Sequence, residues 1–206
     1  MKVLIYAMPR TKSTMLLSGL MTAGAQMLHE PFHFNPIVRN QNSSCQDQVW
    51  NGEEDHIEYL ARVLSNPFQG IKIHASHQGQ KQTMRLFDWA DLIIYPQRDL
   101  LEIACSFCVA VIRNKWNLED KNPNKITAKK EWVEGIVHWN KLFEDVKAAS
   151  KHPNTIEIPW EQDFSKTKTL LAERGVKIGT PKTQITRQVS PTEMISNLEE
   201  LKSWLV

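Results

Sequence analysis

The fold class of this chain can be inferred from its first residues, which read Lys2-Val-Leu-Ile-Tyr-Ala-Met8 and then Pro9-Arg-Thr-Lys-Ser-Thr14. The first run is short, apolar and rich in β-branched and aromatic residues, a composition typical of a buried strand. Behind the polar run, Leu16, Leu20 and Ala23 recur on one face of a predicted helix. A strand, a tight polar turn and a helix direct backbone N–H groups and the positive end of the helix dipole at one point. Since the turn adds two cations and three hydroxyls, the segment predicts an anion site.

This turn differs from the phosphate loop of common ATP- and GTP-binding proteins, which reads Gly-x-x-x-x-Gly-Lys-[Ser/Thr]. Lys12-Ser13 matches the end of that pattern, but Tyr6 and Thr11 occupy the two glycine positions. An ordinary ATP or GTP loop is therefore disfavoured. The alternative that the turn binds nothing stays open, because many α/β domains begin with a strand and a helix.

Length and composition indicate a single domain over residues 1–206. The chain is 41% hydrophobic and 23% charged, which are values of a globular protein with a substantial core. A formal net charge of +2 argues against a general nucleic-acid binder and leaves a small anionic ligand open. The N-terminal apolar run is too short for a secretory signal, and no apolar stretch reaches the length of a transmembrane helix. Because three cysteines make a poor disulfide framework, we expect a cytoplasmic protein without a membrane partner.

Five short apolar segments are predicted to be strands, and helical patterns separate them. The expected strands are 2–8, 26–30, 70–74, 91–97 and 155–159. Strands that alternate with helices predict a three-layer α/β fold, in which a mainly parallel sheet of about five strands is flanked by helices.

Some helix ends and loops can also be predicted. Helices are expected over 53–65, 161–174 and 191–205, with Gly175 as the C-terminal cap of the second. Thr127 is expected to cap a further helix, whose apolar stripe from Trp132 to Val146 faces the core. The segments 32–52 and 116–127 lack periodicity, and such long loops often form binding pockets.

Polar residues follow several of the predicted strands. In open parallel sheets, ligands bind at the carboxyl ends of the strands. The polar residues expected at those ends are Arg10 to Thr14, Glu30, His74, Arg98 and Glu161. Cations, carboxylates and a histidine that converge on one edge indicate a functional site.

At these residues the sequence resembles the sulfotransferases that use 3′-phosphoadenylyl sulfate (PAPS). Pro9-Arg-Thr-Lys-Ser-Thr14 is similar to the loop of that family that holds the 5′-phosphosulfate, Pro-Lys/Arg-Ser/Thr-Gly-Thr/Ser-Thr. Lys72-Ile-His74 resembles its Lys-Thr-His motif, in which the histidine is the general base. Tyr95-Pro-Gln-Arg98, with Ser106 eight residues later, resembles its 3′-phosphate site.

Two weaker similarities and two departures accompany these motifs. Glu30-Pro-Phe32 is similar to Glu-Pro-Leu/Phe of carbohydrate sulfotransferases, and Pro159-Trp-Glu161 resembles a late Tyr-Glu-Asp motif. Lys12 replaces the loop glycine, a residue used where the backbone needs positive φ or approaches a ligand closely. The family's C-terminal Arg-Lys-Gly loop has no clear copy, so Lys182 and Arg187 are only candidates for its role.

The resemblance implies the P-loop NTPase-like sulfotransferase fold. It also implies transfer of a sulfuryl group from PAPS to a hydroxyl or amine of a small-molecule or carbohydrate acceptor, which leaves 3′,5′-diphosphoadenosine (PAP). His74 would be the general base, and Lys72, Arg10 and Lys12 would stabilise developing charge. Glu30 would be an alternative base, a carboxylate that binds the acceptor, or an ion-pair partner of the loop cations Arg10 and Lys12. The residues implied in nucleotide binding are Pro9, Arg10, Thr11, Lys12, Ser13, Thr14, Arg98, Ser106, Lys182 and Arg187.

No metal is expected from the sequence. His29, His33 and His77 have spacings that suit a metal, but no cysteine or carboxylate set completes a site, and sulfuryl transfer needs none. One alternative function is a small ATP-dependent kinase with a degenerate phosphate loop. It would need Mg²⁺ and a nearby carboxylate, whereas Asp91 starts its strand and lies at the wrong end. A non-catalytic nucleotide-binding protein is another alternative, supported by Lys12. The acceptor and the oligomeric state stay open.

Overall fold

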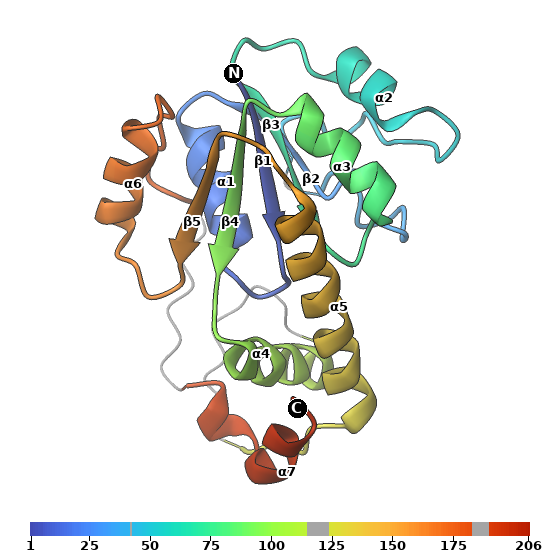
Figure 1. Ribbon diagram of the computed structural model, residues 1–206, viewed down its shortest axis with the longest axis vertical. Helices are drawn as coiled ribbons and strands as arrows, with labels where there is room; N and C mark the ends of the chain where they lie inside the picture. The colour runs from blue at the N-terminus through green and yellow to red at the C-terminus, as the bar shows by residue number, and fades with distance from the viewer. Residues whose placement is uncertain (42, 115–123, 183–189) are drawn as a thin grey trace.

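The protein is an α/β fold built on one parallel sheet (Figure 1). The computed structural model describes residues 1–41, 43–114, 124–182 and 190–206. The strands are β1 (Lys2–Ala7), β2 (Gln26–His29), β3 (Gln69–His74), β4 (Leu92–Gln97) and β5 (Thr155–Pro159). They pair in the order β2-β3-β1-β4-β5, and every pair is parallel. The predicted fold class and all five strands are confirmed, with a sheet that is wholly rather than mainly parallel.

Helices cover both faces of this sheet and complete three layers (Figure 1). The helices are α1 (Ser13–Thr22), α2 (His56–Val63), α3 (Gln80–Trp89), α4 (Leu100–Arg113), α5 (Lys130–Ala149), α6 (Phe164–Ala172) and α7 (Leu198–Ser203), with a 3₁₀ turn, η1, at Thr192–Met194. Helices α1 and α6 pack on one face, and α3 and α5 pack on the other. Among the described residues, no helix combines the length and the apolar composition needed to span a lipid bilayer.

Strand β1 is buried on both sides, because successive side chains of a strand point to opposite faces. Val3 and Ile5 join the apolar cluster under α1, and Leu4 and Tyr6 join the cluster under α5. The Tyr6 ring stacks on Phe143 of α5, with ring centroids 5.2 Å apart. The stripe predicted for α5 therefore does face the core.

The ends of four predicted helices differ from the structure, two because of tertiary contacts and two because of local side-chain caps. The helix expected over 53–65 begins at His56, because Asp55 accepts a hydrogen bond from the N–H of Ile57. Thr127 does not cap α5, which begins at Lys130, and its hydroxyl instead lies 3.0 Å from the Ser196 hydroxyl. The helix expected over 191–205 is broken, because Ile195 is extended and forms a parallel bridge with Ile126. Helix α6 begins at Phe164 rather than residue 161, since Asp163 accepts a hydrogen bond from the N–H of Ser165.

Gly175 ends the α6 segment as predicted. Its φ is 74°, a left-handed conformation that glycine adopts without strain, and the N–H of Val176 donates to Leu171 O at 2.9 Å. This bond satisfies a carbonyl at the end of the helix. The chain then reaches α1, where the N–H of Gly179 donates to Gly19 O at 2.8 Å.

Candidate active site

The strand ends that carry the predicted polar residues meet at one edge of the sheet. Strand β1 lies between β3 and β4, with Ala7 opposite His74 in the register. On the other side of β3, His29 lies opposite Lys72, and the N–H of Glu30 donates to Lys72 O at 2.8 Å. The segments that follow β1, β2, β3 and β4 therefore start side by side, above helix α4 in Figure 1.

The loop after β1 forms a tight turn with two left-handed residues. Arg10 and Lys12 both have positive φ, 68° and 59°. The N–H groups of Met15 and Leu16 both donate to Lys12 O, which starts α1 at Ser13. Within the described residues, the N–H groups of Ser13 and Thr14 form no hydrogen bond. The first turn of α1 therefore presents two unused donors and the positive end of its dipole.

Lys12 adopts a left-handed backbone conformation, with φ 59° and ψ 13°. Its ammonium donates to Trp160 O at 2.7 Å and lies 4.1 Å from the centroid of the Trp160 ring. Glycine adopts such a conformation freely, whereas a residue with a Cβ is strained in it.

Substitution at position 12 should reveal this strain. Lys12→Ala and Lys12→Gly both remove the contacts to Trp160, so they differ only in the backbone. We expect the free energy of unfolding, measured by urea denaturation, to be about 1 kcal/mol higher for Lys12→Gly than for Lys12→Ala. Lys12→Gly is thus the more stable variant. Lys168, exposed in the middle of α6, is the matched control. There glycine should be less stable than alanine by about 0.5–1 kcal/mol, so the same order at both positions would exclude strain at Lys12.

Arg98, Arg10 and Ser106 link three segments that are far apart in the sequence. Arg98 Nη1 donates to Arg10 O at 2.8 Å, across 88 residues, and Arg10 Nε donates to Ser106 Oγ at 3.0 Å, across 96 residues. Arg98 also pairs with Glu102, with Nη2 2.7 Å from Oε2, and its guanidinium carbon lies 3.8 Å from the Trp160 ring centroid. Ser106 is fully buried. In this structure its contact with the candidate site therefore runs through Arg10.

Glu30 is the centre of a second group of contacts. Its Oε1 accepts a hydrogen bond from Lys72 Nζ, and both residues are buried. The same oxygen lies 3.5 Å from His74 Nε2 and 3.4 Å from His29 Nε2. Lys72 Nζ is also 3.5 Å from Thr14 Oγ1. The Lys72–Glu30 pair thus joins the end of β3 to the first turn of α1.

Burial governs the protonation of this group. It lowers the pKa of His74 well below its ordinary value, although Glu30 opposes the shift. Burial also lowers the pKa of Lys72, and the attraction of Glu30 counteracts it. For Glu30 itself, burial would raise the pKa, but His74 and Lys72 reverse this and the net shift is downward. At neutral pH, His74 is therefore a neutral imidazole beside an ionised Glu30. Its Nε2 is buried and has no hydrogen-bond partner among the described residues.

Other predicted residues lie elsewhere. Glu161 is exposed, but its charge acts on Lys12 and Arg98. Lys182 is exposed, and its N–H donates to Ser18 Oγ at 3.0 Å, more than one turn along α1 from the loop. Arg187 lies outside the described residues, as does most of the predicted loop 116–127. The roles proposed for Lys182 and Arg187 stay predictions.

Trp160 lies in the candidate site, although the sequence motifs assigned it no role. It was part of the Pro159-Trp-Glu161 match, yet its contacts with the Lys12 and Arg98 side chains assign it a place beside the loop. Cations within about 6 Å of a tryptophan ring are attracted to its face. A tryptophan directly after a predicted strand end was the available signal.

No metal was expected because no carboxylate set completed a site with the histidines, and the structure now places one beside them. Glu30 supplies the carboxylate that the sequence pattern lacked, because it lies with His33 and His77 such that one ligand atom from each falls within 4.8 Å of the others.

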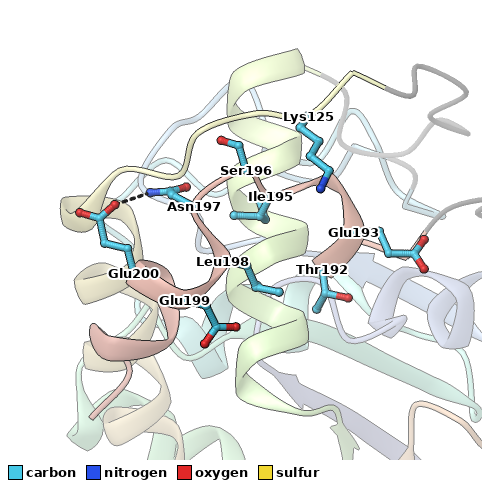
Figure 2. Close-up of a pocket in the computed structure, with 9 residues that line it drawn as sticks. All are labelled: Lys125, Thr192, Glu193, Ile195, Ser196, Asn197, Leu198, Glu199 and Glu200. Carbon is cyan, nitrogen blue, oxygen red and sulfur yellow. Dashed lines mark hydrogen bonds between the residues drawn. The ribbon is translucent and has the colours of Figure 1, made fainter.

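A cavity of about 380 Å³ lies away from these residues (Figure 2). It is lined by Lys125 and by residues of η1 and α7 and the turn between them. None of the predicted strand-end residues lines it, so it does not contribute to the candidate active site.

The fold and the site define an α/β protein with a parallel sheet, at whose carboxyl edge cations, a carboxylate and histidines gather. No protein-family model matches the chain, and no curated protein sequence matches it.

Proposed function

We propose that this protein is a sulfotransferase that moves a sulfuryl group from PAPS to a hydroxyl or amine of a small-molecule or carbohydrate acceptor. One observation carries the proposal. The loop 9–14, the strand-end Arg98 and the helix residue Ser106 each resemble a part of the family's nucleotide site, and they contact one another through Arg10. A parallel sheet alone brings the loop 9–14 and Arg98 to one edge. The hydrogen bonds of Arg10 with Arg98 and with Ser106 add direct contact among the three parts.

The chemistry would use the residues as follows. The acceptor oxygen forms a bond to sulfur while the bond between sulfur and the bridging oxygen of PAPS breaks, and PAP leaves with that electron pair. The acceptor proton passes to His74 Nε2, and Glu30, 3.5 Å away, stabilises the resulting imidazolium. Donor groups at the start of α1, together with Arg10 and Lys72, stabilise charge on the sulfuryl oxygens.

Asp91, the carboxylate weighed for Mg²⁺ in the kinase alternative, lies at the opposite end of the strands from the loop 9–14. Asp91 precedes β4 at its amino end, where it accepts a hydrogen bond from Lys2 N at 2.6 Å and pairs with the N-terminal amine at 3.9 Å. The non-catalytic alternative rested on Lys12, whose backbone is left-handed, a conformation that glycine also adopts. Both observations favour the sulfotransferase, and titration can decide among the three.

Arg98→Ala should weaken PAP binding by about 1.5–3 kcal/mol, which is a factor of about 10–150 in Kd. The guanidinium is expected to hold the 3′-phosphate, and a charged hydrogen bond is lost with it. Calorimetric titration of the purified protein with PAP measures the change. Arg85→Ala is the matched control, since Arg85 forms an ion pair with Asp55 at the surface, on α3.

The same titration with ATP and Mg²⁺ separates the classes of function. Tight PAP binding with little response to Mg·ATP supports the sulfotransferase. Preference for Mg·ATP would overturn it in favour of the kinase, and PAP binding without turnover in an acceptor screen would favour the non-catalytic protein.

A further inference from the structure

Four of the seven histidines gather around Glu30, namely His29, His33, His74 and His77. They come from the end of β2, the loop after it, the end of β3 and the turn that follows β3. The Lys72–Glu30 ion pair does not by itself explain why four histidines surround this carboxylate.

The two oxygens of Glu30 face different partners. Oε1 accepts the hydrogen bond from Lys72, whereas Oε2 accepts none from any described residue. His77 Nε2 lies 3.8 Å from Oε2, too far for a hydrogen bond. The His33 ring contacts His77 edge to face, with ring centroids 4.4 Å apart. An oxygen with unused lone pairs therefore faces two imidazoles.

We propose that Glu30, His33 and His77 bind a divalent transition-metal ion of the zinc class. Two imidazoles and one carboxylate form a donor set that zinc commonly takes in proteins, with a further position left for water or a ligand. The ligand atoms lie within 4.8 Å of one another, compared with roughly 3.4 Å around a tetrahedral zinc with bonds of about 2.0–2.1 Å. The loop that carries His33 must therefore close slightly on Glu30.

Metal binding would change the roles of the ring nitrogens of both histidines. Coordination through Nε2 would place the ring proton on Nδ1. That atom now accepts the N–H of His74 at 3.4 Å in His77, and the N–H of Asn35 at 3.0 Å in His33. Two backbone hydrogen bonds would thus be exchanged for two coordination bonds.

The metal site and the proposed catalytic group share Glu30 through different oxygens. A metal on Oε2 leaves Oε1 paired with Lys72 and near His74. The inference does not rest on sulfuryl transfer, because metal binding can be measured without nucleotide or acceptor.

Calorimetric titration of chelator-treated protein with Zn²⁺ tests the proposal. The unmodified protein should bind one ion per chain, and Mg²⁺ at the same concentration should bind far more weakly. His77→Ala and His33→Ala should each weaken Zn²⁺ binding by at least about 100-fold. His138→Ala, an exposed histidine on α5, should leave the affinity unchanged.

A thermal midpoint and a Co²⁺ spectrum distinguish the loss of a metal ligand from misfolding of the variants. His33 is only partly buried, so His33→Ala should keep the thermal midpoint of the metal-free protein. Co²⁺ in place of Zn²⁺ should give visible absorption that both ligand variants lose and His138→Ala retains. Absence of stoichiometric Zn²⁺ binding, or equal affinity in His33→Ala, His77→Ala and His138→Ala, would overturn the proposal.

Discussion

His74→Ala is expected to lower the rate of sulfuryl transfer by about 10²–10⁴-fold, while the affinity for PAP stays nearly unchanged. A positioned general base contributes a factor of this size because it removes the acceptor proton as the new bond forms. The His74 Nε2 is buried, unpartnered among the described residues and 3.5 Å from Glu30 Oε1. His74 ends β3, whereas Arg98 follows β4 on the other side of β1. Turnover of PAPS with an acceptor found by screening, together with a PAP titration, measures both effects.

His74 and Glu30 are the two candidate bases, and the activity of His74→Ala tests the first of them. His138→Ala, which changes a histidine outside the site, should keep full turnover and serves as the control. Full activity in His74→Ala would refute the assignment of His74 and make Glu30 the next candidate. A parallel loss of PAP affinity would instead show that the histidine supports the nucleotide site.

The architecture was predictable because it depends on local patterns. The apolar run 2–8, the polar turn and the helix behind it appear in the structure with shifts of about one residue at the ends of β1. The largest errors lie where a partner distant in sequence governs the backbone. Ile195 is extended because it bridges Ile126, and this contact both breaks the helix expected over 191–205 and removes Thr127 from its capping role. Nothing in the local pattern of either segment signals the other.

The position of the site at the carboxyl ends of the strands was predictable, but the contacts among its residues were not. Parallel strands bring their carboxyl ends together, so Arg10, Glu30, His74 and Arg98 were expected on one edge. Which of them pair depends on side-chain directions and burial, and these follow from the packed structure. Glu30 pairs with Lys72 on β3, whereas the ion-pair alternative named the cations of the loop after β1 as its partners. The left-handed backbone at Lys12 also runs against the usual preference of lysine.

Glu30→Gln is expected to destabilise the folded protein by about 3–5 kcal/mol, measured by urea denaturation at pH 7. Lys72 is 1% exposed, and Glu30 is its only carboxylate partner among the described residues. Removal of that partner leaves a buried ammonium without a counter-charge. Asp145→Asn is the control, because the Lys141–Asp145 pair on the surface of α5 should contribute less than about 1 kcal/mol.

Two further measurements identify the buried charge as the cause. In the double variant Glu30→Gln/Lys72→Met no charge is left unpaired, so it should recover much of the lost stability. Burial already lowers the pKa of Lys72, and loss of Glu30 removes the attraction that opposes this shift. In Glu30→Gln the folded state therefore binds fewer protons than the unfolded state between the lowered pKa and the ordinary one. Since stability rises with pH wherever the unfolded state binds more protons, the deficit of Glu30→Gln should shrink as pH rises from 7 toward 10. A deficit that is independent of pH, or no larger than that of Asp145→Asn, would show that Lys72 is not held as a buried cation.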